Sequence, residues 1–334
     1  MIKKIIAAFN EVSSDKGNPS AKWVAPYTAP ESAETNQFIF FIKPEATNVE
    51  AGVHLGEVVD ICLARLDAFN VKIGGVRVLN GDYLSAYSVM DQHYGVINAI
   101  SKKGRAAISA EAEAKLQELF ADDLAAGATV LGGHQFIDQV DGFSALALST
   151  LNDNLGTTKL AGGTYVMKAK VLGTPYLILN PFHAYQLVPY TTPGKAIVVI
   201  EGTSDTDWEA LRTNLAGTTD PTTAAEGSIR NALLNNQSRT GMADVSQGSN
   251  GVHLSAGPLE GMVELQRFFT DHRAQSAPDL ADTAFGALLG SKGISDEQRT
   301  KLAGNPDLIR DDKAVSAFDL TEEVNATDAA DLLA

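Results

Sequence analysis

Residues 250–255 read Asn-Gly-Val-His-Leu-Ser, which places the imidazole of His253 between an amide and a hydroxyl. Glu264 follows His253 by eleven residues. A nucleophilic histidine needs an acceptor that fixes its tautomer, and it needs nearby donors for the charged group that it attacks. Asn250, Ser255 and Glu264 are residues of these types. Taken by itself, the segment is more typical of a structural histidine that is held by hydrogen bonds.

A second candidate side chain stands at the end of the apolar segment 38–42, where Lys43 is followed by Pro44. A short apolar run bounded by polar and turn residues predicts a buried strand. A lysine at the end of such a strand points its ammonium group into a site. Lys43 is therefore a candidate partner of the His253 segment.

Hydrophobic periodicity and turn residues predict the elements that would position these side chains. The predicted strands are 38–42, 71–79, 195–200 and 250–254, and the predicted helices are 56–69, 82–94, 205–215 and 258–269. Once the segment 96–178 is left out, these elements follow a βαββαβ order. We therefore expect an α+β fold whose core is a ferredoxin-like antiparallel sheet with helices on one face.

Several short motifs follow one another in the order in which a known family has them. They are Lys43-Pro44, His93-Tyr94, Asn180-Pro181-Phe182, Glu201-Gly202, Gly217-Thr218-Thr219-Asp220-Pro221, Gly227-Ser228-Ile229-Arg230 and the segment around His253. Through them, residues 36–95 and 179–275 resemble nucleoside diphosphate kinase, with a discontinuous catalytic domain that covers roughly half of the 334 residues. The chain departs from the family pattern at Leu254, where a small residue is usual, and at Ala256, which replaces an acidic residue.

The resemblance implies a ping-pong transfer of the γ-phosphate from a nucleoside triphosphate to a nucleoside diphosphate. His253 would carry the phosphoryl group, Glu264 would orient the imidazole, and Ser255 would assist at the phosphate. The other matched residues are Lys43, Arg212 and Arg230 for phosphate or sugar, Thr219 for phosphate, Asn250 for the ribose 3′-hydroxyl, Phe182 for the base, and Tyr94 in the catalytic site. Arg212 matches only after a shift of one residue. Mg²⁺ would arrive on the nucleotide phosphates, without a dedicated protein site.

Three segments lie outside the resemblance: an N-terminal extension, 1–35, an insertion, 96–178, and a C-terminal extension, 276–334. The first is polar and carries Trp23 and Tyr27 as aromatic side chains for docking. The insertion, with a predicted helix at 109–126 and a hairpin at 164–179, is expected to form an α/β segment. It could shape base specificity or an oligomer contact, or only add stability. The C-terminal extension has predicted helices at 279–289 and 295–302, and its acidic end, 319–334, is typical of a solvated tail or of a segment packed on a neighbouring subunit.

Composition agrees with a soluble enzyme. The formal net charge of −15 disfavours nucleic acid or an anionic membrane as the main partner, because either would require a basic surface. The one cysteine, Cys62, excludes an internal disulfide, and we find neither a secretory leader nor an apolar run of membrane-spanning length. We therefore predict a cytoplasmic protein, and the resemblance implies a homo-oligomer.

Other catalytic motifs are absent from the sequence. It has no Gly-x-x-x-x-Gly-Lys-Ser/Thr loop, no Gly-x-Ser-x-Gly elbow, and no His/Cys spacing that suggests zinc. Two hypotheses remain: an active, divergent nucleoside diphosphate kinase, and a catalytically weak nucleotide-binding or regulatory protein on the same fold. The presence of both His253 and Glu264 favours the first, since a binding module needs no nucleophile.

Overall fold

A computed structural model describes residues 1–310 and 313–334, which form a mixed α+β fold. They divide into two compact units, one made of 1–89 and 190–334 and the other of 90–189. The second unit includes the whole of the segment 96–178, and the first includes the C-terminal extension 276–334. Within the described residues, no helix is both long and apolar enough to cross a membrane.

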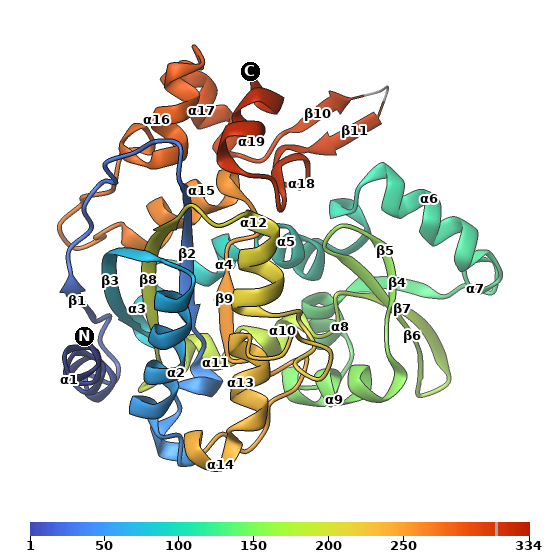
Figure 1. Ribbon diagram of the computed structural model, residues 1–334. Coiled ribbons are helices and arrows are strands. Elements are labelled where there is room, and N and C mark those ends of the chain that lie inside the picture. Colours follow the sequence, from blue (N-terminus) through green and yellow to red (C-terminus); the bar gives the residue numbers. More distant parts are fainter. Residues whose placement is uncertain (311–312) are drawn as a thin grey trace. The chain divides into compact units, whose positions relative to one another are not determined.

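The first unit is built on a five-stranded antiparallel sheet with the order β1-β3-β8-β2-β9 (Figure 1). Its strands are β1 (Ala21–Ala25), β2 (Asn36–Ile42), β3 (Lys72–Asn80), β8 (Ala196–Ser204) and β9 (Val252–Leu254). The four predicted strands all form, and β8 extends beyond its predicted end. β9 lies at one edge, so only one of its sides is paired with another strand.

Helices of the first unit precede, connect and follow these strands. They are α1 (Ile2–Ser14), α2 (Leu55–Ala68), α3 (Gly81–Ala86), α12 (Trp208–Ala210), a π-helix (Leu211–Ala216), α13 (Ile229–Asn235), α14 (Gln237–Thr240), α15 (Pro258–Phe269), α16 (Ala284–Ser291), α17 (Asp296–Ala303), α18 (Ala317–Thr321) and α19 (Ala326–Leu333), with short 3-10 turns at Pro44–Ala46, Val49–Ala51 and Leu280–Asp282. Two helices at the joins between the units are α4 (Val89–His93) and α11 (Val188–Thr191). A two-stranded ribbon, β10 (Asp307–Arg310) and β11 (Lys313–Ser316), completes the C-terminal extension.

Both faces of the first sheet are covered, so the prediction of helices on one face is wrong. Phe38 and Phe40 of β2 point into a core that also holds apolar side chains of α1, α2 and α13. Phe41 points the other way, and its ring centroid lies 5.3 Å from that of Phe268 on α15. Every residue of β2 and of β8 is buried. A strand that is apolar on both sides requires cover on both faces, and α15 supplies the second layer.

The N-terminal segment 1–35 is more integral to the fold than its polar composition predicts. Along α1, apolar residues recur at helical spacing, and four of them are buried in the main core: Ile5, Ala8, Phe9 and Val12. β1 pairs antiparallel with β3 and extends the sheet. The expected docking of aromatic side chains is confirmed, because the Trp23 ring packs edge-on against Phe269 at 5.3 Å between centroids.

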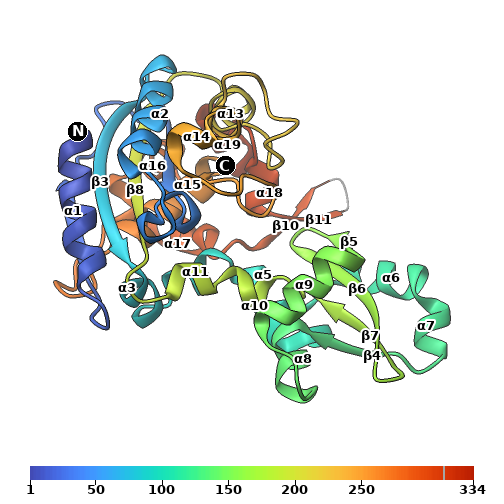
Figure 2. The same cartoon turned by 90° about the horizontal axis from the view of Figure 1, so that it is seen from below.

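The second unit has its own four-stranded sheet with the order β4-β7-β6-β5, in which only the β4–β7 pair is parallel (Figure 2). Its strands are β4 (Thr129–Gly132), β5 (Thr158–Ala161), β6 (Thr164–Val171) and β7 (Thr174–Leu179). Its helices are α5 (Gly95–Lys103), a 3-10 turn (Gly104–Ala107), α6 (Ala110–Leu119), α7 (Ala121–Ala125), α8 (Gly133–Gln139), α9 (Ala145–Leu155) and α10 (His183–Gln186). The predicted hairpin is present as β6 and β7.

The C-terminal extension packs on its own unit, which corrects the expectation of a solvated tail. Ala326, Ala329 and Ala330 of α19 are buried with Leu259 and Met262 of α15 in one apolar cluster. Helix 279–289 is split in the structure into a 3-10 turn and α16, and the helix predicted at 295–302 is α17. An alanine-rich, acidic helix can therefore bury the face that carries its alanine side chains and leave its carboxylates in water.

A buried carboxyl group joins the sheet to the extensions at both ends of the chain. Glu201 on β8 is 1% exposed, and its Oε1 accepts a hydrogen bond of 2.8 Å from Gln37 Nε2. Gln37 Nε2 also lies 3.2 Å from the Tyr27 hydroxyl, and its Oε1 accepts from Ala284 N at 2.7 Å. Burial raises the pKa of Glu201 to about 7, and the hydrogen bond from Gln37 works in the opposite direction.

We expect Glu201→Gln to flatten the pH dependence of stability. The folded protein holds this proton more tightly than the unfolded chain, so the free energy of unfolding falls as pH rises from about 4.5 to about 7, by roughly 3 kcal/mol. The variant has no proton to lose and keeps an acceptor for Gln37. In urea titrations it should be more stable than the wild type at pH 8, with the advantage shrinking by pH 5. Equal pH slopes for the two proteins would refute this role of burial.

Candidate functional site

The strand that carries His253 follows directly after a position that requires glycine. Gly251 has φ +80°, and a Cβ atom there would lie 2.6 Å from Leu233 Cδ1. After this turn β9 pairs with β2, so that His253 lies opposite Phe41. Neighbouring residues of a strand point to opposite faces. Leu254 is accordingly fully buried in the α1–α2 core, on the face away from the His253 ring, and does not crowd the imidazole.

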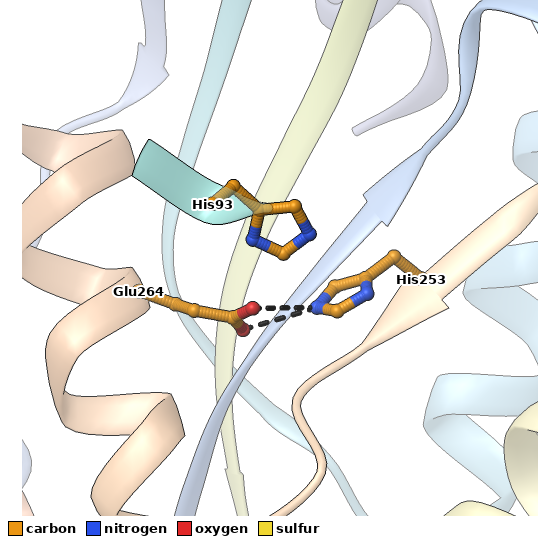
Figure 3. Close-up of side chains that lie close together, drawn as sticks. All are labelled: His93, His253 and Glu264. Atoms are coloured by element: carbon orange, nitrogen blue, oxygen red, sulfur yellow. Dashed lines mark hydrogen bonds and ion pairs between the residues drawn. The ribbon is translucent and has the colours of Figure 1, made fainter. Parts of the chain in front are cut away.

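His253, Glu264 and Ser255 form the hydrogen-bonded group that their types and spacing predict. The Nε2 atom of His253 lies 2.9 Å from Oε1 and 3.1 Å from Oε2 of Glu264 (Figure 3). The Ser255 hydroxyl donates to Oε2 of the same carboxylate at 2.5 Å. An ionised carboxylate only accepts hydrogen bonds, so this contact places the histidine proton on Nε2 and the ring lone pair on Nδ1.

The turn from β9 into α15 explains how Glu264 reaches His253. Pro258 occupies the first turn of α15, where its missing N–H costs no hydrogen bond. The helix then runs along the sheet face that carries His253, and it presents Glu264, which is completely buried. The ring of Phe41 stacks on the imidazole at 4.5 Å between centroids. His253 itself keeps 18% of its side chain exposed, so a solvent-borne group can reach it.

Two arginines bind the outer edge of β9 on either side of His253. Arg230 Nη2 donates to the carbonyl of Val252 at 3.0 Å, and Arg212 Nη1 donates to the carbonyl of Leu254 at 2.8 Å. These carbonyls are two residues apart and point away from β2. Burial, together with the nearby charge of Arg212, lowers the pKa of Arg230 to about 10, which leaves it cationic at neutral pH. The edge strand is thus flanked by two fixed positive charges.

Lys43 and Asn250 form a second cationic part of the site. Lys43 Nζ donates to Asn250 Oδ1 at 2.7 Å, and Asn250 Nδ2 donates to the Thr219 carbonyl at 3.1 Å. Burial lowers the pKa of Lys43, and Arg230 lowers it further, whereas Glu45 raises it. A cationic amine that is partly desolvated and close to another cation gains from binding an anion.

Thr219 contributes to this part through its backbone, and its residue is exposed. Tyr94 and Phe182 belong to the second unit, where each ring contacts another aromatic ring. The Tyr94 ring lies 5.9 Å from that of His183, and the Phe182 ring lies 5.7 Å from that of Tyr165. Eight of the ten predicted site residues therefore belong to the first unit.

Sequence reasoning missed two acidic residues beside the site. Glu45 Oε1 accepts from Gly251 N at 3.1 Å and supplies a negative charge close to Lys43 and Arg230. Glu260, one helical turn before Glu264, accepts from Ala256 N at 2.8 Å. Burial, and next the charge of Glu264, raise the pKa of Glu260 to about 8. The position of Glu45 just after the Lys-Pro pair was the only sequence signal for either residue.

Comparison with known proteins adds little to this geometry. No family model matches the chain, and no curated protein matches it. Among solved structures, an NDP kinase from Pyrobaculum aerophilum is similar over 72% of this chain and 98% of its own length, at 19% identity and a TM-score of 0.33. No conclusion about fold or activity follows from a likeness at that score.

Proposed function

We propose that this protein is a nucleoside diphosphate kinase that transfers a γ-phosphate through a phosphohistidine at His253. The observation that carries the proposal is the fixed imidazole: Glu264 holds Nε2 at 2.9 Å, and Arg212 and Arg230 bind the strand on either side of it. A structural histidine has no need of two cations at its own strand edge. A phosphoryl acceptor does, because negative charge accumulates around it.

In the first half-reaction, Nδ1 of His253 attacks the γ-phosphorus of a Mg²⁺-bound nucleoside triphosphate. The Nδ1–P bond forms as the bond from phosphorus to the β,γ-bridging oxygen breaks, and the nucleoside diphosphate leaves with that electron pair. The proton on Nε2 stays with the Glu264–imidazole pair, where the carboxylate stabilises the positive charge that develops on the ring. A second nucleoside diphosphate then attacks the phosphohistidine with a terminal oxygen and restores His253.

The cationic residues would neutralise the phosphates during both half-reactions. Lys43 and Arg230 are partly desolvated, so an anion regains for them the stabilisation that water no longer gives. Arg212 lies on a π-helix, Leu211–Ala216, which holds one more residue per hydrogen-bonded turn than an α-helix and often marks a functional site. Arg212 matches the family's arginine only after a shift of one residue along the helix. The extra residue in a π-helical turn is a shift of that size.

The strand arrangement supports the same family. In chain order, β2, β3, β8 and β9 are the first to fourth strands, and they lie side by side in the order second, third, first, fourth, all antiparallel. A ferredoxin-like βαββαβ domain has this order. The roles of Tyr94 and Phe182, the Mg²⁺ on the nucleotide, the homo-oligomer and the cytoplasmic location stay predictions of the sequence.

Initial-rate kinetics with purified protein test the proposal. A double-displacement enzyme should make GTP from MgATP and GDP with parallel lines in double-reciprocal plots, since the first product leaves before the second substrate reacts. If calorimetry showed nucleotide binding and no GTP were formed, the proposed kinase activity would be wrong. That result would instead favour the alternative, a nucleotide-binding or regulatory protein on the same fold.

A further inference from the structure

The C-terminal extension reaches the candidate site at the turn between α18 and α19. Glu323 N donates to the carbonyl of Ala256 at 2.8 Å, just beyond β9. Gly257 must be glycine for this approach, because a Cβ atom there would collide with the carbonyl oxygen of Thr321. The backbone of the extension is thus fixed against the segment that joins His253 to Glu264.

Asn325 fixes the other end of this turn to the helix that leads to Arg212. Its Oδ1 accepts from the backbone N of Trp208 and from Asn36 Nδ2, both at 2.9 Å. Asn36 Oδ1 in return accepts from the backbone N of Ala326 at 2.9 Å. The turn is therefore held between the start of β2 and the start of α12.

The hydrogen bonds at Ala256 and at Asn325 together place Glu323 beside Arg212. Glu323 Oε1 lies 3.5 Å from Arg212 Nε, while Nη1 of the same guanidinium binds the Leu254 carbonyl. Glu323 has φ +57°, a conformation that a non-glycine side chain adopts only when its surroundings hold it there. The two side chains are 42% and 24% exposed, so the pair is weak and a ligand with more negative charge can displace the carboxylate.

We propose that Glu323 is a positioning residue which competes with nucleotide phosphate for Arg212. In the ligand-free protein the carboxylate occupies one side of the guanidinium and keeps it close to β9. An incoming di- or triphosphate replaces it, so that the C-terminal extension sets how tightly the site holds its nucleotide. This inference rests on the proposed function, in which Arg212 is a phosphate ligand.

The test compares Glu323→Gln with Glu322→Gln, which removes the same charge from the neighbouring residue. Glutamine keeps the length of the side chain, and the hydrogen bond from the backbone N–H of residue 323 to the Ala256 carbonyl is unaffected, so both variants should fold. Calorimetry with MgADP should show binding about 1.5- to 5-fold tighter for Glu323→Gln, with a lower KM and an unchanged kcat, and a smaller gain for Glu322→Gln. In an Arg212→Ala background the difference between the two variants should vanish.

Two results overturn the inference on its own: equal affinities of Glu323→Gln and Glu322→Gln, or a gain that persists in the Arg212→Ala background. A wild-type protein that binds no MgADP overturns it together with the proposed function. The two failures are thus distinguishable in one set of titrations.

Discussion

Replacement of His253 by alanine is expected to reduce GTP formation from MgATP and GDP by roughly 10⁴-fold or more. In the proposed mechanism only the imidazole forms a bond to phosphorus, and Glu264 already orients it, with 2.9 Å between Oε1 and Nε2. Alanine removes the nucleophile but leaves Lys43, Arg212 and Arg230 in place. The affinity for MgADP, measured by calorimetry, should therefore change only a few-fold.

A matched control for this variant is His54→Ala. His54 is exposed in the same unit, and its Nδ1 lies 2.8 Å from the carbonyl oxygen of Arg239, so it takes no part in the proposed site. The His54→Ala variant should form GTP from MgATP and GDP at the wild-type rate. A His253→Ala protein that retains more than about one hundredth of the wild-type rate would show that another group carries the phosphoryl transfer.

Glu264→Gln is expected to lower kcat by roughly 10²- to 10⁴-fold and to change KM little. The carboxylate gives one oxygen to Ser255 and binds His253 with both. An amide has one accepting oxygen and a donating NH₂ group. With the oxygen in place of Oε1, the NH₂ group faces the Ser255 hydroxyl; with the oxygen in place of Oε2, the NH₂ group lies where Oε1 faces the N–H of His253. Either orientation sets two donors against each other, and because Glu264 is completely buried, water cannot relieve the conflict.

Glu260→Gln provides the control from the same helix. Burial raises the pKa of Glu260 to about 8, so the group is mostly neutral at pH 7 and resembles an amide in charge and shape. Its hydrogen bond goes to the backbone N of Ala256, not to the imidazole. We expect near wild-type kcat. If Glu264→Gln kept full kcat in a protein of normal thermal stability, the orienting role of Glu264 would be wrong.

Much of the core could be predicted from local pattern. Apolar runs at 38–42, 71–79 and 195–200 predicted β2, β3 and β8, and the strand at 250–254 and the helix at 258–269 correspond to β9 and α15. These features depend on neighbouring residues and on periodicity, which a single sequence carries. The two central side chains of the site, His253 and Glu264, were found from their residue types and spacing and from the resemblance to a known family.

Helix interruptions were not predicted. The helix expected at 82–94 is broken into α3 and α4, with Ser88 at φ +51° between them, and the helix expected at 109–126 breaks at Phe120 into α6 and α7. The helix expected at 205–215 becomes a short α-helix and a π-helix. Tertiary packing outweighs helix propensity at such positions, and the sequence has no local signal for it.

The long-range polar contacts of the site also could not be predicted from the sequence. Arg212 and Arg230 were matched as phosphate ligands, yet nothing in their spacing shows that each binds a carbonyl beside His253. Glu323 lies 111 residues beyond Arg212 in an acidic segment that resembled a solvated tail. Contacts between a side chain and a distant backbone carry no compositional pattern, so only the folded structure reveals them.

A phosphohistidine at His253 is tested by incubating the protein with Mg²⁺ and γ-labelled ATP, without any acceptor, beside His253→Ala. We expect a protein-bound label that is labile to acid, stable to alkali, absent from the variant, and released as labelled GTP when GDP is added. Equal labelling of His253→Ala, or a wild-type protein that binds nucleotide and takes up no label, would contradict a phosphohistidine at His253.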